Sequence, residues 1–286
     1  MNPLIVTLML GTATPGGGFP VYGDAFADMV NAQDPSLAIR TQNTKGSAEN
    51  VPLLEAGKIE LGLVAGEIAT GALAMPGARL RIVTAMYSSP GMFAVRGDSP
   101  VRAIADLKGQ TVVLGTQGSG LTVLGRGVLD VLGIEVKPIF LEKAADGPAM
   151  VLDGRAAALW GAGVGWPGFT TVAKAGGRFV APNENEIATI LAKNTALKAL
   201  TMPAGSYPGQ EAPLRTVGSW SFVLAKPQLP EEIGYTLARA IHRAEAPLAA
   251  RLAQARETTM RNTRDAAPTP ELIHPGVAKY LKEIGL

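Results

Sequence analysis

The sequence predicts an α/β protein with two lobes, each a mostly parallel β-sheet flanked by helices. The first observation is a strand, a glycine-rich turn and a helix in residues 6–29. The second is a repeat of this order in residues 111–132, where the turn reads TQGSG. The third is the alternation of short apolar runs with helical patterns along the chain, which favours a sheet covered on both faces. Two lobes explain the two series of strands and helices more simply than one long sheet.

The first series starts with an apolar strand at residues 3–10, which runs into the turn at residues 14–18. Glycine accepts positive φ angles there, and Pro20 suits a first helical turn. Ser47 stands where a helix cap belongs, three residues before Asn50, and predicts a helix over residues 47–56. The other elements expected in this part are strands at 38–42, 59–65 and 80–86, with a loop at 66–70.

The second series starts beyond Met92 and repeats the same alternation. Glycine and proline cluster in residues 202–213 and predict a loop. The predicted strands are 93–95, 111–115, 136–141, 156–160 and 216–224. The predicted helices are 101–107, 121–132, 145–152, one starting near Pro167 within 163–171, 231–246, 248–258 and 276–283.

Composition limits the function. The chain has 286 residues, 47% of them hydrophobic and 17% charged, with a formal net charge of +2. Such a chain can bury a large core, but it has no basic stripe for nucleic acid, which is not an expected partner. There is no cysteine, so thiol catalysis and disulfides are excluded. Asp and Glu are scattered singly and there are two His, so no metal site and no cofactor are expected.

The apolar residues 3–10 could be mistaken for part of a signal peptide. A signal peptide normally carries Lys or Arg before its apolar run, and here only Met1 and Asn2 precede Pro3. We therefore expect a first strand of a chain that lacks its signal peptide.

Three helix starts predict a binding site for an anion: after Gly18, at Ser47, and after Gly120. The first N–H groups of a helix have no intrahelical acceptor and carry a partial positive charge, so they hold a carboxylate or phosphate without a formal charge. Two of these starts lie in one predicted lobe and the third in the other. We expect them to face one ligand in a cleft when the lobes close. An ordinary tight turn is the alternative interpretation of each.

Five segments in a fixed order carry a family resemblance: GTATPGGG at 11–18, KGSAEN at 45–50, ADLKGQTVVLGTQGSG at 105–120, AGSYPGQ at 204–210 and HPGVAKYLKEIGL at 274–286. In these segments the chain resembles the TAXI family of solute receptors of tripartite ATP-independent periplasmic (TRAP) transporters. The resemblance implies a two-lobed periplasmic binding protein (type II-like) joined by two crossover strands. Lobe I would comprise residues 1–91 and 222–286, and lobe II residues 92–221.

The resemblance also implies the function. The chain would be an extracytoplasmic, periplasmic receptor that binds a small organic anion between its lobes and delivers it to the membrane subunits of a TRAP permease. It would be a monomer and not an enzyme.

The anion-binding role is assigned to turn residues and to nearby hydroxyl groups and rings. Gly16, Gly17, Gly18, Ser47, Ser119 and Gly120 would donate hydrogen bonds, and Thr14, Thr116 and Tyr207 would add hydroxyl groups. Phe19, Tyr87, Trp160 and Trp166, with Gly161 at the strand end, would shape the apolar part.

Departures from the family pattern favour a less polar ligand. Phe19 takes one place of a frequent tyrosine pair, and Tyr22 lies a turn later. Leu121 stands where threonine is frequent, and Ala65 where glutamine is frequent. Lys45 replaces a frequent glycine, so its ammonium would pair with a second carboxylate or be a solvated loop charge. We expect a carboxylate with an apolar or aromatic body.

An enzyme is the alternative class of function. Residues 111–142 form a βαβ unit with GSG in its turn and Glu142 after the second strand, as in a dinucleotide-dependent oxidoreductase. Val123 stands where that pattern needs a third glycine or alanine. His242 is expected within a helix and His274 at a helix cap, and neither has a serine or carboxylate at motif spacing.

Overall fold

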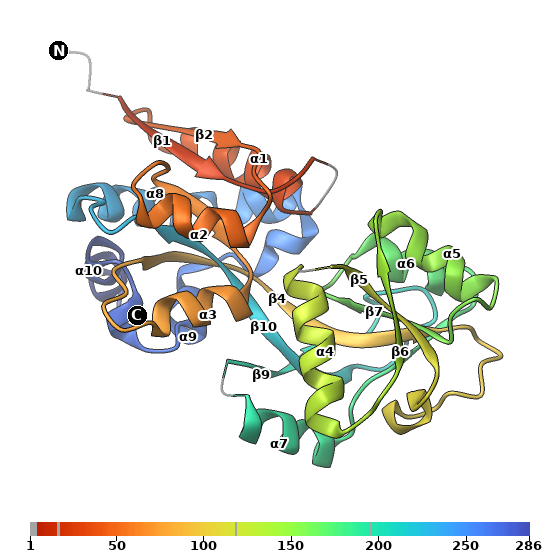
Figure 1. The fold of residues 1–286 in the computed structure, drawn as a ribbon. Helices are drawn as coiled ribbons and strands as arrows, with labels where there is room; N and C mark the ends of the chain where they lie inside the picture. Colours follow the sequence, from red (N-terminus) through yellow and green to blue (C-terminus); the bar gives the residue numbers. More distant parts are fainter. Residues whose placement is uncertain (1–4, 16–17, 118, 195) are drawn as a thin grey trace. The chain divides into compact units, whose positions relative to one another are not determined.

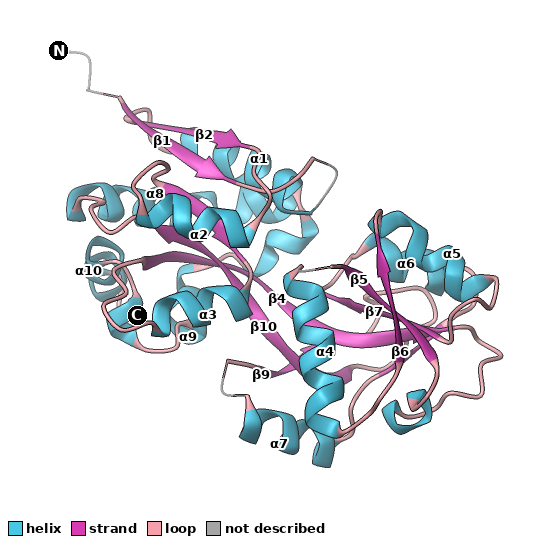
Figure 2. Cartoon of the chain, in the orientation of Figure 1, coloured by secondary structure: helices cyan, strands magenta, loops and turns pink. Residues whose placement is uncertain are grey.

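The protein forms two compact units of α/β structure. In the computed structural model, residues 5–15, 18–117, 119–194 and 196–286 are described. Unit 1 comprises Met1–Tyr87 and Trp220–Leu286, and unit 2 comprises Ser88–Ser219. Two strands, β4 (Arg81–Val95) and β10 (Leu214–Ala225), contribute residues to both units. The predicted α/β class is confirmed (Figures 1 and 2).

Unit 1 is built on the sheet order β2-β1-β3-β10. Strands β1, β2 and β3 are parallel, and β10 is antiparallel to β3. Apart from β4 and β10, the strands and α-helices are β1 (Val6–Gly11), α1 (Gly18–Asn31), β2 (Leu37–Gln42), α2 (Ser47–Glu55), β3 (Leu61–Val64), α3 (Gly66–Ala74), α8 (Glu231–Arg251), α9 (Met260–Ala266) and α10 (Pro275–Glu283). Two short 3₁₀ helices, Ala253–Glu257 and Pro270–Leu272, flank α9.

Helices cover both faces of the unit 1 sheet because the strands are apolar on both sides. Phe26 of α1, Ile241 of α8 and Val277 of α10 belong to one buried cluster. Leu54 of α2 and Leu73 of α3 belong to the other. Strand residues alternate between the clusters, as side chains on a pleated strand must.

Unit 2 has the sheet order β4-β7-β5-β6, with β8 paired to β4 and β9 to β10. Strand β5 is parallel to β6 and β7, and the other pairings are antiparallel. The further strands and α-helices are β5 (Thr111–Thr116), α4 (Gly120–Leu132), β6 (Lys137–Leu141), α5 (Gly147–Leu152), β7 (Ala158–Ala162), α6 (Pro167–Lys174), β8 (Arg178–Val180), α7 (Glu184–Lys193) and β9 (Lys198–Met202). Helices α4 and α7 share one buried cluster, and α5 and α6 the other.

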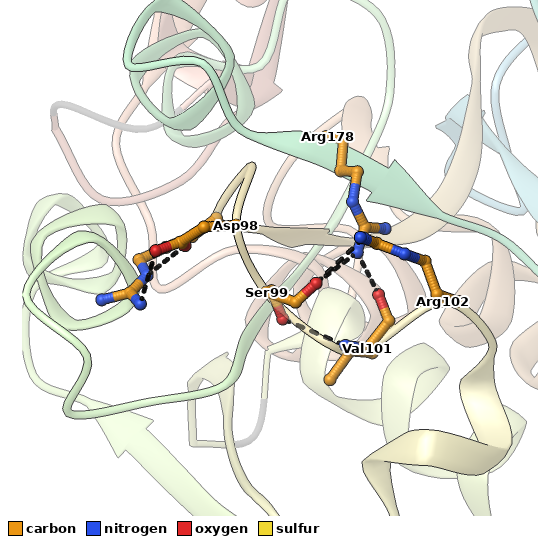
Figure 3. A network of polar contacts seen from close by, with 6 residues as sticks. Asp98, Ser99, Val101, Arg102 and Arg178 are labelled. Atoms are coloured by element: carbon orange, nitrogen blue, oxygen red, sulfur yellow. Dashed lines mark hydrogen bonds and ion pairs between the residues drawn. The ribbon is translucent and has the colours of Figure 1, made fainter.

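Arginine side chains fasten the loop between β4 and β5. Arg178 Nη2 donates to the carbonyl oxygens of Ser99, at 2.8 Å, and of Val101. Arg102 Nη1 donates to the same Ser99 oxygen at 2.9 Å (Figure 3). Neighbouring Asp98 forms an ion pair with Arg96 instead. The loop carbonyls are therefore satisfied by side chains from β8 and from the loop itself.

Several predicted elements differ in the structure. Residues 66–70 form the start of α3 rather than a loop, because Ala69 and Leu73 are buried against the sheet. The strands predicted at 80–86 and 93–95 are one strand, β4, since the fixed φ of Pro90 is compatible with extended backbone. Helix α8 continues through Pro247, where burial of Ala244 and Leu248 outweighs one lost hydrogen bond.

No helix in the described part of the chain has both the length and the apolar character needed to cross a bilayer. Helix α8 is long enough, with 21 residues, but it carries charged residues along its length.

Candidate functional site

The carboxyl ends of β2, β1 and β3 meet at one edge of the unit 1 sheet. Gly11, the last residue of β1, lies opposite both Gln42 of β2 and Gly62 of β3. The helices α1, α2 and α3 start just beyond this edge. We call residues 12–15, 18–19, 44–47 and 65–66 the first corner.

Asn50 holds the first corner together from within. It is fully buried, and Nδ2 donates to the carbonyl oxygens of Gly11 (3.1 Å), Thr12 (2.8 Å) and Leu63 (2.8 Å). Its Oδ1 accepts from Thr44 Oγ1 at 2.8 Å. A Cβ atom on Gly11 would lie 2.6 Å from Oδ1, so that position must be glycine for Asn50 to fit. One side chain therefore ties the ends of β1 and β3 to the loop before α2.

Ser47 connects two helix starts, but it does not cap α2. The N-cap is Gly46, at φ 93°, and the predicted cap role of Ser47 is wrong. The Ser47 hydroxyl oxygen instead accepts from the Ala65 N–H at 2.9 Å, because Ser47 lies within the first turn of α2 and faces the end of β3. Gly46 N–H donates to Thr44 Oγ1 at 3.0 Å. The starts of α2 and α3 are thus joined directly.

The other predicted site residues of unit 1 lie either at the first corner or in the core, except for two that are not described. Thr14, Gly18 and Lys45 are exposed at the corner, and Phe19 and Ala65 are half-buried there. Gly16 and Gly17 lie outside the described residues. Two predicted residues lie in the core instead, Tyr22 and Tyr87.

The two core tyrosines face each other rather than the corner. Their rings meet edge to face at 5.5 Å, and the Tyr22 hydroxyl lies 2.9 Å from Thr258 Oγ1. Burial raises the pKa of both phenols, so both stay neutral at any physiological pH. Tyr22 of α1 and Tyr87 of β4 therefore belong to the packed core of unit 1.

Unit 2 has a comparable edge at the carboxyl ends of the parallel strands β5 and β7. The second corner comprises residues 116–117, 119–122 and 163–166, at the starts of α4 and α6. Ser119 is the N-cap of α4, and its Oγ accepts from the Thr122 N–H at 3.2 Å. The Thr122 hydroxyl donates to the Thr116 carbonyl at 2.7 Å. Thr116, Ser119, Gly120 and Leu121 are therefore brought together, half-buried.

Trp160 lies beneath the second corner, in the core. It is fully buried, and its Nε1 donates to the Leu121 carbonyl at 2.8 Å. Its ring fits where Gly91 and Gly125 have no side chains: a Cβ on either would lie within 2.7 Å of it. Trp160 thus holds the first turn of α4 onto β7.

Trp166 is the half-buried ring of the second corner. Its indole covers Gly161 and Gly168, where a Cβ would lie within 2.5 Å of the ring. Its backbone N–H donates to the Tyr207 hydroxyl at 2.8 Å, and that hydroxyl donates to the Gly163 carbonyl at 2.7 Å. Tyr207 is buried, and burial raises its pKa. Its hydroxyl both accepts and donates a hydrogen bond in the turn before α6.

Asn50 and Thr122 organise the two corners, and neither was predicted as a site residue. Both are buried polar side chains a few residues into a helix. The signal for Asn50 was its place in the KGSAEN segment, and Thr122 had none beyond its spacing of three from Ser119. Among the described residues, no group of three or more His, Cys, Asp or Glu could hold a metal ion.

Replacing Trp160 with Phe is expected to destabilise the protein by about 1–3 kcal/mol, because the smaller ring leaves space in the core and the Leu121 carbonyl loses the indole donor. Urea unfolding at equilibrium measures this, with Trp220→Phe at a half-buried position as the matched control. Equal midpoints for the two variants would contradict this expectation.

The predicted cap role of His274 is confirmed. It is the N-cap of α10, with Nδ1 accepting from the Gly276 N–H at 3.2 Å and Nε2 lying 3.0 Å from the Leu229 carbonyl. Nε2 therefore carries the proton of a neutral ring. Burial lowers the pKa of this imidazole below its usual 6.5. The predicted place of His242 within a helix is confirmed too.

His274 predicts a loss of stability in mild acid. Below about pH 6.5 the unfolded chain takes up a proton that the folded ring resists, so the free energy of unfolding falls as pH falls from that value through the lowered pKa. Urea titrations between pH 7.5 and 5.5 should show this slope. His274→Asn keeps a cap and removes the titration; an identical slope in that variant would assign the effect to other groups.

Comparisons with known proteins agree with this architecture. Residues 10–285 match the model of the NMT1-like family. The periplasmic aliphatic sulphonate binding protein SsuA from Escherichia coli is similar in structure, with a TM-score of 0.56 and 20% identity over 96% of this chain and 82% of that one. A TctC solute binding protein from Polaromonas gives 0.58 and 17%, over 97% and 98%.

The BenM effector binding domain, solved with its effector benzoate, gives a TM-score of 0.54 and 12% identity over 84% of this chain and 92% of that one. At these identities the likeness concerns the fold, which is that of two-lobed periplasmic binding proteins. The family match covers nearly the whole sequence, and this chain belongs to the NMT1-like family.

Proposed function

We propose that this chain is a periplasmic receptor that binds a small organic anion and delivers it to a membrane transporter. The observation that carries the proposal is the first corner, where α1, α2 and α3 all start at one edge of a parallel sheet around buried Asn50. Their first N–H groups have no acceptor within the helices and attract negative charge.

The comparisons support the same class of function. Two similar structures are named as periplasmic or solute binding proteins, and a third was solved with an aromatic carboxylate. Phe19 and Trp166 are half-buried rings near the two helix starts, and each packs in part against the core of its unit. Within the proposal, the ligand is a carboxylate or sulphonate with an apolar or aromatic body.

The finer assignments rest on the resemblance of the sequence to the TAXI family. We propose that the transporter is of the TRAP type, that residues 1–91 with 222–286 and residues 92–221 act as the two lobes, and that both corners bind one ligand. Ligand contacts are assigned to Thr14, Gly18, Phe19, Ser47, Ser119, Gly120 and Trp166. Four predicted residues are buried and are assigned a packing role: Tyr22, Tyr87, Trp160 and Tyr207.

Identification of a bound molecule tests the proposal. Protein purified under native conditions is denatured, and the released small molecules are identified by mass spectrometry. A panel of carboxylates and sulphonates is then screened by thermal unfolding, with NAD as a probe of the oxidoreductase alternative. We expect an organic anion to be released and to raise the melting temperature. Stabilisation by NAD and by no organic anion would contradict the proposal.

A further inference from the structure

The charges at the first corner limit the charge of the ligand, an inference that rests on the proposed function. The described loops and first helical turns at this corner carry three charged side chains: Lys45, Glu49 and Glu67. Two are acidic and one is basic, so their sum is −1. A site built for a dianion would be expected to carry a positive sum.

Glu49 places a negative charge in the first turn of α2. It is the third residue of α2, two residues after Ser47, and is half-buried. Its Oε2 accepts the backbone N–H of Lys45, which fixes the carboxylate at the positive end of α2. A carboxylate in a first turn offsets the partial charge of its helix start.

The three helices of the corner differ in whether their first turn contains an acidic residue. Helix α2 has Glu49 in its first turn and α3 has Glu67, whereas the first turn of α1 has no acidic residue. The start of α1, which follows the glycine-rich turn, is therefore the helix end of this corner whose positive charge stays available. One anionic group can be bound there.

Lys45 does not reverse this balance. Its side chain is exposed, and its backbone is held by the carboxylate of Glu49. An exposed ammonium is screened by water and salt, and a half-buried carboxylate is screened less. A second anionic group on a ligand would therefore meet Glu49 more strongly than Lys45.

We propose that Glu49 is a specificity-determining residue that makes this receptor selective for monoanions. It leaves one anionic group of the ligand to the start of α1 and repels a second one. Like charges within several ångströms of each other in a partly buried site change affinity by tenfold or more.

Matched pairs of ligands test the selectivity. Isothermal titration at pH 7.5 compares benzoate with terephthalate, and butane-1-sulphonate with butane-1,4-disulphonate, against wild type, Glu49→Gln and Glu55→Gln. Gln at position 49 keeps the acceptor for Lys45 N–H and removes the charge, and exposed Glu55 at the other end of α2 is the matched control. Circular dichroism and thermal unfolding confirm that each variant is folded.

We expect wild type and E55Q to bind the monoanion of a pair at least tenfold more tightly than its dianion, and E49Q to reduce that ratio at least threefold. A wild-type preference for the dianion, or an unchanged ratio in E49Q, would overturn the inference and leave the receptor function standing. If no carboxylate or sulphonate, in these pairs or in the wider panel, binds any of the three proteins, the proposed function itself fails.

Discussion

Replacing Asn50 with Leu is expected to destabilise the protein by about 2–6 kcal/mol and to weaken anion binding at least tenfold. Leu has a similar volume but no donors, so at least two of the carbonyls of Gly11, Thr12 and Leu63 lose their partner. A buried acceptor left unpaired costs about 1–3 kcal/mol. The Thr44 hydroxyl would also lose Asn50 as a partner and keep the Thr12 carbonyl.

Chemical denaturation and titration with the best anion measure both effects of N50L. Asn185→Leu, on the exposed side of α7, is the matched control and should change stability by less than 0.5 kcal/mol. If N50L unfolded within 1 kcal/mol of wild type, Asn50 would not be the residue that holds the corner together.

Gly276→Ala should destabilise unit 1 by about 3 kcal/mol or more. A Cβ atom at this position would lie 2.0 Å from the Glu231 carbonyl oxygen and 2.5 Å from the Tyr235 nitrogen, both in the backbone of α8. Neither can move without displacing the helix. Helix α10 would have to retreat from α8, exposing the buried cluster that contains Val277 and Leu281.

The control for Gly276 is Gly71 of α3, where an added Cβ meets nothing within 4 Å. Gly71→Ala should stabilise by about 0.5–1 kcal/mol, since alanine is the better helix former. Urea unfolding of the two variants therefore separates packing from helix propensity. Equal effects of the two substitutions would show that α10 and α8 do not pack as closely as described.

The elements that position the site were largely predictable. The strands and turns at residues 6–29 and 111–132 follow from apolar runs that end in glycine, and the structure has β1, α1, β5 and α4 there. These segments are predictable because two local signals indicate the same elements: the turn conformation that glycine favours and the burial of the apolar run. The same agreement holds for His274, whose side chain caps α10.

Other elements depended on contacts that no local pattern shows. Helix α3 forms although Gly66 and Gly71 favour a loop, because Ala69, Ala72 and Leu73 are buried. Strand β8 has three residues and no periodicity to detect. Helix α7 was missed although Asn183 and Glu186 form a capping box, a usable signal.

The candidate site was predictable in its backbone and less so in its side chains. Glycines and small hydroxyl residues mark turns, but whether an aromatic residue lines a site or fills a core depends on its neighbours in space. Trp160 is enclosed by Gly91 and Gly125, which are 69 and 35 residues away in the sequence. Asn50 serves carbonyls of two strands, which only the folded sheet brings together.

The central claim is that backbone N–H groups at the helix starts bind the anion. Amide ¹H–¹⁵N spectra of labelled protein, recorded while the best organic anion from the screen is added, observe those groups directly. The claim predicts saturable downfield proton shifts of Gly18, Phe19, Ser47 and Gly120 that exceed those elsewhere in the chain. Saturable binding that leaves these four amides unchanged and shifts a different set would contradict it.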